Sequence, residues 1–274
     1  MSSVTSLLPA IPTYLADIKD ETGKAEKWAK TDVTAKVDIA DLESSADKLD
    51  TAKDLLKDYK ALKTVLTAFG MEGSISSTAL LKQLMTQDPT SSTSLAQKSG
   101  NATWLRFAKA MNGYATNPFA DSEGLASVVS SYTVAAYEKA QGNMVVGLKQ
   151  ALAFQRTASA ITSANSLILN PDALKVVVSQ TGLNYAQFAT LGYSQQVSLL
   201  NRTVTFSDFQ DTKKVNQLAE QYLLQAGQDP TNWGAVDATT YTITSLFGAN
   251  STPSVLDLFG SSTSTSYSVL NLFA

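Results

Sequence analysis

The sequence contains no cysteine and no histidine among its 274 residues. A disulfide framework is therefore excluded, as are zinc sites built from Cys and His ligands. The same absence excludes catalytic systems that pair a serine or cysteine nucleophile with a histidine base. The chain also lacks the glycine-rich motifs that hold nucleotide phosphates. We therefore expect no catalytic residue, no metal site and no cofactor, and we do not expect an enzyme.

Charge is scarce, because Asp, Glu, Lys and Arg make up only 16% of the residues. The net charge of −3 disfavours nucleic acid as a partner. The sequence contains no cluster of Lys and Arg of the kind that binds an anionic membrane surface. No run of 18 apolar residues occurs, so no membrane span is expected. The first 18 residues contain no Lys or Arg and are interrupted by Pro9 and Pro12, unlike an ordinary secretory signal.

Hydroxyl side chains take the place of the missing charge, with 31 Ser and 30 Thr residues. The sequence divides into three segments by composition. Residues 1–45 form an N-terminal arm that begins apolar and hydroxylated, residues 46–230 form a helical body, and residues 231–274 form a Ser/Thr-rich tail. About half of the charged residues lie between 17 and 63, where acidic and basic side chains are interleaved as on a solvated helix face.

Apolar residues recur at helical spacing between 46 and 227, and no sustained alternation of the strand type occurs there. We therefore predict an all-α, multihelical body. The longest pattern runs from Leu49 to Phe69 and predicts one helix that ends at Gly70. Asp121 or Ser122 is expected to cap a helix that Gly142 and Asn143 separate from the next. Other helices are predicted at 77–87, 102–112, 144–157, 171–181, 194–201 and 212–225.

The stretch from Phe154 to Leu183 has the clearest local signals. Asn170 precedes Pro171, which is tolerated in the first turn of a helix because it has no N–H, and the Asn side chain can cap that turn. Gly182 is expected to end the helix with a positive φ. Leu174 and Val177 are predicted to lie on its buried face.

The same pattern occurs 112 residues earlier. Ala61-Leu62-Lys63 leads to Gly70-Met71, as Ala173-Leu174-Lys175 leads to Gly182-Leu183. We interpret this as a weak internal duplication with halves at 46–141 and 142–230. The alternative is that any helix followed by glycine and an apolar residue looks alike.

The tail repeats a short apolar motif in a polar background. Ser254–Phe259 and Ser268–Phe273 match at an offset of 14 residues, and no Lys or Arg follows Lys214. One interpretation is a disordered tail with chance Leu-Phe pairs. We favour repeated partner-docking motifs, with the candidate residues Leu246, Phe247, Leu258, Phe259, Leu272 and Phe273.

Three other patterns are explained better by structure than by chemistry. Ser45-x-x-Lys48 has a catalytic spacing, but its companion motifs are missing and a helix start explains it. The acidic ladder of Asp47, Asp50, Asp54 and Asp58 is interleaved with lysines, which indicates a solvated face rather than a metal or acid–base site. The three tryptophans, Trp28, Trp104 and Trp233, are expected to be core or contact residues.

The chain resembles the bacterial domain-of-unknown-function 1217 family over about 46–227. The resemblance lies in Thr162-Ser163-Ala164, Asn170-Pro171, Ala173-Leu174, Gly182-Leu183 and Asp208-Phe209-Gln210-Asp211, with an earlier half around Leu66–Met71 and Trp104–Met111. Members are multihelical and often encoded beside flagellar genes, and the resemblance carries over no catalytic residue. Both tails lie outside it.

These observations favour a non-enzymatic structural or interaction protein of the bacterial flagellum, located outside the cell. Its expected partners are other copies of itself or flagellar axial subunits, which it meets through its termini. One alternative is a cytoplasmic assembly factor or export chaperone for flagellar proteins. A second alternative is a surface or secreted protein that leaves the cell through a C-terminal signal.

Overall fold

The computed structural model describes residues 9–229 and 233–234. All of these belong to one compact unit, residues 3–236. The remaining unit, residues 1–2 and 237–274, lies outside the described residues, and so do all six candidate docking residues of the tail. The structural account below therefore concerns the compact unit alone.

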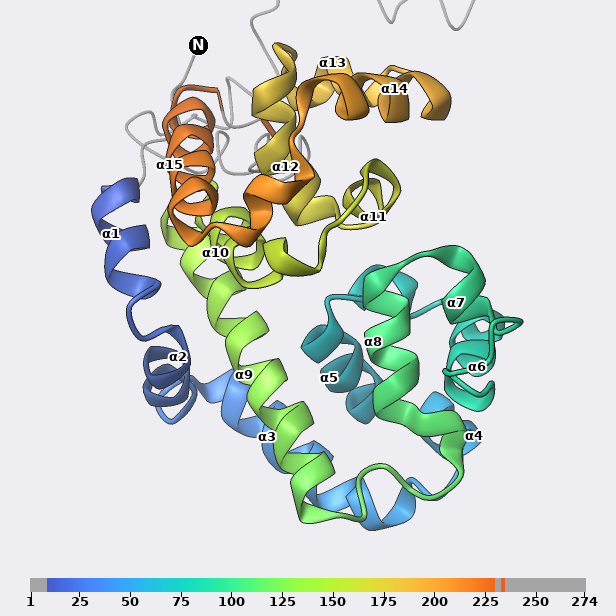
Figure 1. Ribbon diagram of the computed structural model, residues 1–274. Coiled ribbons are helices and arrows are strands. Elements are labelled where there is room, and N and C mark those ends of the chain that lie inside the picture. Colours follow the sequence, from blue (N-terminus) through green and yellow to red (C-terminus); the bar gives the residue numbers. More distant parts are fainter. Residues whose placement is uncertain (1–8, 230–232, 235–274) are drawn as a thin grey trace, which may run out of the picture. The chain divides into compact units, whose positions relative to one another are not determined.

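The described residues form an all-α body without strands, as the sequence predicts (Figure 1). Short 3₁₀ turns link several of its helices. The fifteen α-helices of this part of the chain are α1 (Ala10–Asp17), α2 (Glu21–Ala29), α3 (Val33–Ser45), α4 (Ala52–Lys57), α5 (Tyr59–Phe69), α6 (Thr78–Thr86), α7 (Leu95–Ser99), α8 (Ala102–Met111), α9 (Ser122–Met144), α10 (Leu148–Thr157), α11 (Ala164–Ile168), α12 (Pro171–Val178), α13 (Tyr185–Ala189), α14 (Tyr193–Thr203) and α15 (Thr212–Gln228). None of them combines the length and the apolar character that a membrane span needs.

Two large hydrophobic clusters form the interior. The first cluster contains buried residues between 29 and 132 and surrounds α5. The second contains buried residues between 145 and 226, together with Tyr14 of α1. Helices from the N-terminal 45 residues contribute to both clusters. Residues 9–45 thus belong to the same compact unit as the residues that follow.

One structural pattern occurs twice in this unit, at a separation of 112 residues. In the first repeat, α3 leads through a 3₁₀ turn (Ala46–Lys48) to the short α4, then to α5 and Gly70. In the second repeat, α10 leads through a 3₁₀ turn (Ala158–Ala160) to the short α11, then to α12 and Gly182. The contacts repeat as well, because α5 packs on α3 and α4 as α12 packs on α10 and α11.

The central stretch folds as its local signals predict. Pro171 is the first residue of α12, and the Asn170 side chain accepts a hydrogen bond of 3.2 Å from the backbone N–H of Ala173. Gly182 has φ +77° and follows a final 3₁₀ turn. Leu174 and Val177 are both buried. This confirms the predicted helix and its buried face.

Two predicted helix boundaries are wrong, and helices α1, α2, α3, α7, α11 and α13 were not predicted. The single helix from Leu49 to Phe69 is two helices, because Asp58 leaves the helical region with ψ 93° and caps α5. Gly142 and Asn143 do not break a helix, since α9 continues to Met144 and the chain turns at Gly147 with φ +80°. Gly142 is needed for close packing instead, because a Cβ there would lie 2.7 Å from Lys149 Cβ.

Candidate polypeptide-docking groove

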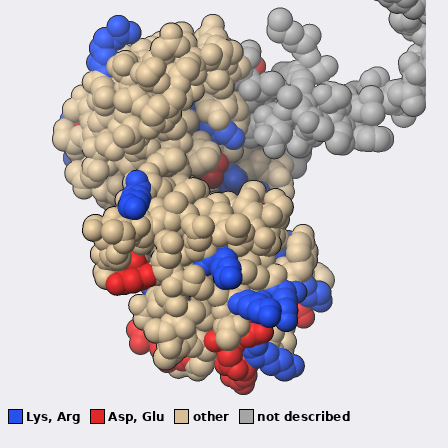
Figure 2. All heavy atoms as spheres, turned by 90° about the vertical axis from the view of Figure 1, so that its right-hand side faces the viewer, with Lys and Arg blue, Asp and Glu red and all other residues tan. Residues whose placement is uncertain are grey.

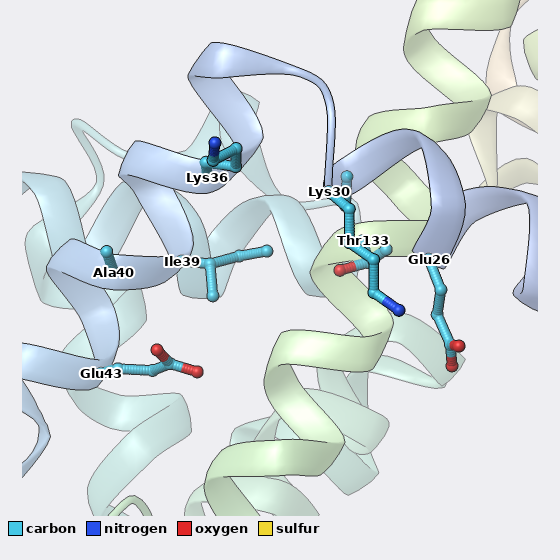
Figure 3. Close-up of a pocket in the computed structure, with 8 residues that line it drawn as sticks. Glu26, Lys30, Lys36, Ile39, Ala40, Glu43 and Thr133 are labelled. Atoms are coloured by element: carbon cyan, nitrogen blue, oxygen red, sulfur yellow. The ribbon is translucent and has the colours of Figure 1, made fainter.

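An open groove of about 440 Å³ lies between α2, α3 and α9 (Figure 3). Its floor is apolar and consists of small or branched side chains from all three helices. The residues that line it are Glu26, Ala29, Lys30, Lys36, Ile39, Ala40, Glu43 and Thr133. Apolar pockets of this size with a few polar groups at the edge are the usual form of a binding site.

Local capping fixes the two helices that form the walls of the groove. The Asp20 side chain caps α2 by accepting from the Gly23 N–H, and the Asp32 side chain caps α3 by accepting from the Ala35 N–H at 2.8 Å. The turn between them closes when the N–H groups of Thr31 and Asp32 both donate to the carbonyl of Trp28, each at 2.9 Å. The groove is therefore built on a capped helical hairpin.

The rim of the groove carries charges of both signs. Lys36 and Glu43 lie apart along α3, while on the opposite wall the Lys30 side chain extends toward Glu26 (Figure 3). No ion pair joins any of these four side chains to another of the described residues. The groove therefore offers unpaired charge of both signs to whatever binds in it.

Two valines extend the apolar surface beside the groove. Val33 is 75% exposed and Val37 is 50% exposed, and the two are one turn apart on α3. Ala40, which lines the groove, continues the same i, i+4, i+7 row. Exposed β-branched residues in line with an apolar floor form a continuous surface of the kind that marks protein contacts.

A buried ionic cluster holds α2 against the helices behind it. Arg156 of α10 donates from Nε and Nη2 to the two carboxylate oxygens of Glu138 of α9, at 2.9 and 2.8 Å. Burial and then the charge of Glu138 raise the pKa of Glu21 of α2 to about 8, although Arg156 acts to lower it. Burial also raises the pKa of Glu138, and the charge of Arg156 opposes that rise. Glu21 is therefore mostly protonated at neutral pH.

A second ionic contact anchors the start of α2. The buried carboxylate of Asp17 accepts a hydrogen bond from Lys24 Nζ at 2.8 Å and another from the Tyr137 hydroxyl at 3.1 Å. Burial, followed by the charge of Asp17, raises the pKa of Tyr137 well above its usual value. Since Lys24 lies on α2 and Tyr137 on α9, this contact links two of the three helices that form the groove.

A smaller polar cavity of about 80 Å³ lies among α5, α8, α9, α10 and α12. Its charges are paired with one another, through Glu138 with Arg156 and through Lys149 with Asp172 at 3.4 Å. Arg106 donates from Nη2 to the Phe69 carbonyl at 3.1 Å and lies over the Phe69 ring. The pair of Glu138 and Arg156 joins the two repeats, and the cavity is too small for anything much larger than a water molecule or two.

The charged residues of the surface are unevenly distributed (Figure 2). Figure 2 shows few charged side chains over the upper part of this view and many over its lower part. Most of the charged residues between 17 and 63 are exposed, as on the predicted solvated face, and the groove and the two exposed valines lie among them.

The other patterns noted in the sequence have structural roles. The Ser45 hydroxyl donates to the carbonyls of Asp41 and Leu42 at the end of α3, so it faces its own helix. Asp54 and Asp58 cap helices. Trp28 and Trp104 pack against the first cluster and Trp233 against the second, as expected for contact residues. Among the described residues, no three Asp or Glu side chains converge in a way that could hold a metal ion.

Sequence reasoning missed the groove. The charges between 17 and 63 were interpreted as a solvated face, which gave no reason to look for an apolar floor among them. The signal that could have revealed it is the row of Val33, Val37 and Ala40 within a strongly charged helix.

Comparison with known proteins supports the fold. A family described as "Protein of unknown function (DUF1217)" matches residues 68–215 of the chain. No match was found among curated proteins. Among solved structures, the chain is similar to the crystal structure of protein AGR_C_984 from Agrobacterium tumefaciens, with 19% sequence identity and a TM-score of 0.67. That similarity covers 81% of this chain and 94% of the other, and at this identity it establishes the fold alone.

Proposed function

Since the chain belongs to the DUF1217 family, we propose that it is a non-enzymatic structural and interaction protein of the bacterial flagellum. It is exported and assembled into or onto the axial structure, where it contacts other subunits. The flagellar part of this proposal is supported by the genes that often neighbour those of family members. The scarcity of charge, the abundance of Ser and Thr and the absence of cysteine are compatible with it.

The observation that carries the interaction part of the proposal is the groove between α2, α3 and α9. It combines an apolar floor, a rim with unpaired charges and two exposed valines. These features suit a polypeptide, whose side chains fill the floor while its charges pair with the rim. The groove also rests on capped helices and a buried ionic cluster, so a partner meets a preformed surface.

The tail supplies a second set of contacts in this proposal. Residues 251–274 lie outside the described residues, and they contain the candidate docking residues Leu258, Phe259, Leu272 and Phe273. A single Leu-Phe pair binds weakly, but several linked pairs raise one another's effective concentration. We expect the tail to act on a neighbouring subunit.

The test is whether the protein co-purifies with sheared flagella. An epitope-tagged chain is expected in the sheared fraction of a flagellated strain and absent from the equivalent fraction of a strain that lacks filaments. A chain without residues 251–274, or with Phe259→Ser and Phe273→Ser, is expected to keep its melting temperature and to lose this association. Retention in the cytoplasm would favour an assembly factor or export chaperone, and release independent of filaments would favour a secreted protein; either result overturns the proposal.

A further inference from the structure

Helix α2 is held in place by little apolar contact. Of its nine residues, only Ala25 and Ala29 are buried. Trp28 is half-buried, and its ring packs edge-on against Tyr137 of α9 with the ring centroids 6.0 Å apart. This small apolar area contributes much less than the eight buried residues of α5 contribute to that helix. The attachment of α2 to α9 therefore depends strongly on its polar contacts.

The ionic cluster at the start of α2 contains more carboxyl groups than basic groups. Arg156 is committed to Glu138 through two hydrogen bonds, and Lys24 is committed to Asp17 through one. Among the described residues, no ion pair involves Glu21, the third carboxyl group. Glu21 Oε1 and Asp17 Oδ2 are buried without a hydrogen-bond partner in the described part of the chain. An ionised Glu21 would therefore add an uncompensated charge beside two other carboxyl groups.

The titratable and charged groups that face Glu21 come from three neighbouring helices. They are Tyr14 and Asp17 of α1, Tyr137 and Glu138 of α9, and Arg156 of α10. Burial, followed by the charge of Glu138, raises the pKa of Glu21 to about 8, and only Arg156 acts to lower it. In a detached α2 this carboxyl group returns to water and to its ordinary pKa of 4.5. The contribution of Glu21 to docking is thus complete below about pH 4.5 and is lost as pH rises to about 8.

We propose that α2 is a pH-sensitive switch, which is docked on α9 in acid and detaches locally, without global unfolding, as Glu21 ionises. The helices on either side stay attached, because Tyr14 of α1 is buried in the second cluster and Ala35 and Leu42 of α3 are buried in the first. Since α2 forms one wall of the groove, its detachment removes the candidate docking surface. This last consequence rests on the proposed function, whereas the detachment itself requires no partner.

A single introduced thiol can report the detachment, because the chain has no cysteine. Ala25→Cys places the thiol beneath α2, where Ala25 is fully buried against Val134 and Tyr137 of α9. Ala151→Cys places it in the second cluster, where only global unfolding exposes it. The rate of alkylation by iodoacetamide, measured on the full chain between pH 6 and pH 8.5, reports how often each site opens.

The reference for this measurement is Ala25→Cys combined with Glu21→Gln, which keeps a neutral side chain at every pH. The intrinsic pH dependence of the thiol is shared by both variants and cancels in the ratio of their rates. We expect that ratio to rise by at least about tenfold from pH 6 to pH 8.5. Adding Glu26→Gln, which changes an exposed carboxylate of the same helix, should leave the rise unchanged. Ala151→Cys should react far more slowly than Ala25→Cys at each pH.

Three results would overturn the proposal. A ratio that does not change with pH means that Glu21 does not control α2. Equal rates at positions 25 and 151 mean that the chain opens only as a whole. Rapid alkylation of Ala25→Cys already at pH 6 means that α2 is not docked in acid.

Thermal melting at pH 6 shows whether each variant is folded. If Ala25→Cys is not, Ala29→Cys replaces it as the reporter, since Ala29 is 6% exposed and lies one turn further along α2. Alkylation of the isolated chain and recovery with sheared flagella are separate measurements. Failure of the switch is therefore distinguishable from failure of the proposed function.

Discussion

The first and second repeats share their helix-terminating and capping positions and many, but not all, of their core side chains. Thr51 and Ser163 each begin a short helix with a reciprocal capping box, and Asp58 and Asn170 each cap the helix that follows. Several buried pairs are identical, such as Leu55 with Leu167 and Val65 with Val177, whereas Leu42 with Phe154 and Leu66 with Val178 differ in size and shape. Backbone signals and part of the core therefore specify the unit, while the remaining core positions are packed according to their own surroundings.

The comparison also shows where the repeats depend on each other. Each has its own large hydrophobic cluster, whereas α2, α9 and α10 contact one another through a small apolar cluster and the buried pair of Glu138 with Arg156. Substitutions at equivalent positions should have similar effects within the two cores, and different effects where the surroundings differ. The following predictions use that contrast, from the largest expected effect to the smallest.

The largest effect concerns Glu21 and pH. Its pKa is about 8 in the folded chain against an ordinary value of 4.5, so the folded state binds this proton more tightly than the unfolded state. The resulting stability is complete below about pH 4.5 and is lost as pH rises to about 8. At about 1.36 kcal/mol per pKa unit the loss is at most about 5 kcal/mol, and the partial exposure of Glu21 reduces it.

Urea unfolding between pH 5 and pH 8 measures this dependence. We expect Glu21→Gln to flatten it, because an amide keeps the neutral form at every pH. The exposed Glu123→Gln serves as the control and should leave the slope unchanged. Since the chain has no histidine, few other groups titrate in this range. A steep loss of stability that persists in Glu21→Gln would assign it to another group.

The next effect compares equivalent core leucines. Leu62 of α5 and Leu174 of α12 are 112 residues apart and are 3% and 7% exposed. Replacing either by Ala should lower the free energy of unfolding by about 2–5 kcal/mol, the range for a buried leucine that leaves a cavity. Chemical denaturation of both variants checks this. A loss in only one of them would show that the repeats are not equivalent in the core.

Two glycines separate backbone strain from packing. Gly147 and Gly182 both have a positive φ, of +80° and +77°. A Cβ at Gly147 would lie 3.1 Å from Ala226 Cβ and from the Tyr222 ring, whereas a Cβ at Gly182 meets nothing within 4 Å. Both Gly→Ala changes should cost about 1–2 kcal/mol in backbone strain, and Gly147→Ala about 1–3 kcal/mol more through overpacking.

Thermal melting of these two variants, with Gly70→Ala as a third, measures the difference. Gly70 is the equivalent of Gly182 and also has open space around it. It should therefore behave like Gly182. Equal losses of stability in Gly147→Ala and Gly182→Ala would mean that α15 shifts to accommodate the new Cβ without an overpacking penalty.

The smallest effect is expected at the two caps. The side chains of Asp58 and Asn170 accept hydrogen bonds from Ala61 and Ala173, at 3.0 and 3.2 Å. Replacing either residue by Ala should lower the free energy of unfolding by about 1 kcal/mol. Asp58→Ser and Asn170→Ser should retain most of that stability, because serine also caps helices. A loss confined to one site would show that the other helix is held by tertiary packing alone.

The accuracy of the sequence-based predictions follows from these features. Asn170, Pro171 and Gly182 act within a few residues of themselves, so their roles were predicted correctly. The break at Asp58 was missed because α4 and α5 pack on the same cluster, so the apolar spacing from Leu49 to Phe69 continues across it. Asp58 was interpreted as one of several acidic residues on a solvated helix face, so its role as a helix cap was not predicted.

Burial could not be derived from local sequence. Ala40 of α3 and Leu152 of α10 lie at equivalent positions, yet Ala40 is exposed and Leu152 is fully buried. The difference arises from α1 and α15, which are far from α10 along the chain. The groove was missed for the same reason. A helix face remains open when no distant helix packs on it, and local sequence does not show which helices pack together.

Helix α9 links the repeats as a continuous rod of 23 residues. One part of it packs on α5, while Glu138 and Gly142 near its C-terminal end contact α10. An α-helix turns by about 100° and rises about 1.5 Å for each residue. Inserting one residue between Thr133 and Glu138 would therefore rotate the groove about the axis of α9 relative to the second repeat, whereas inserting four would nearly restore the phase. The angular relation between the open groove and the second repeat is thus encoded in the length of one helix.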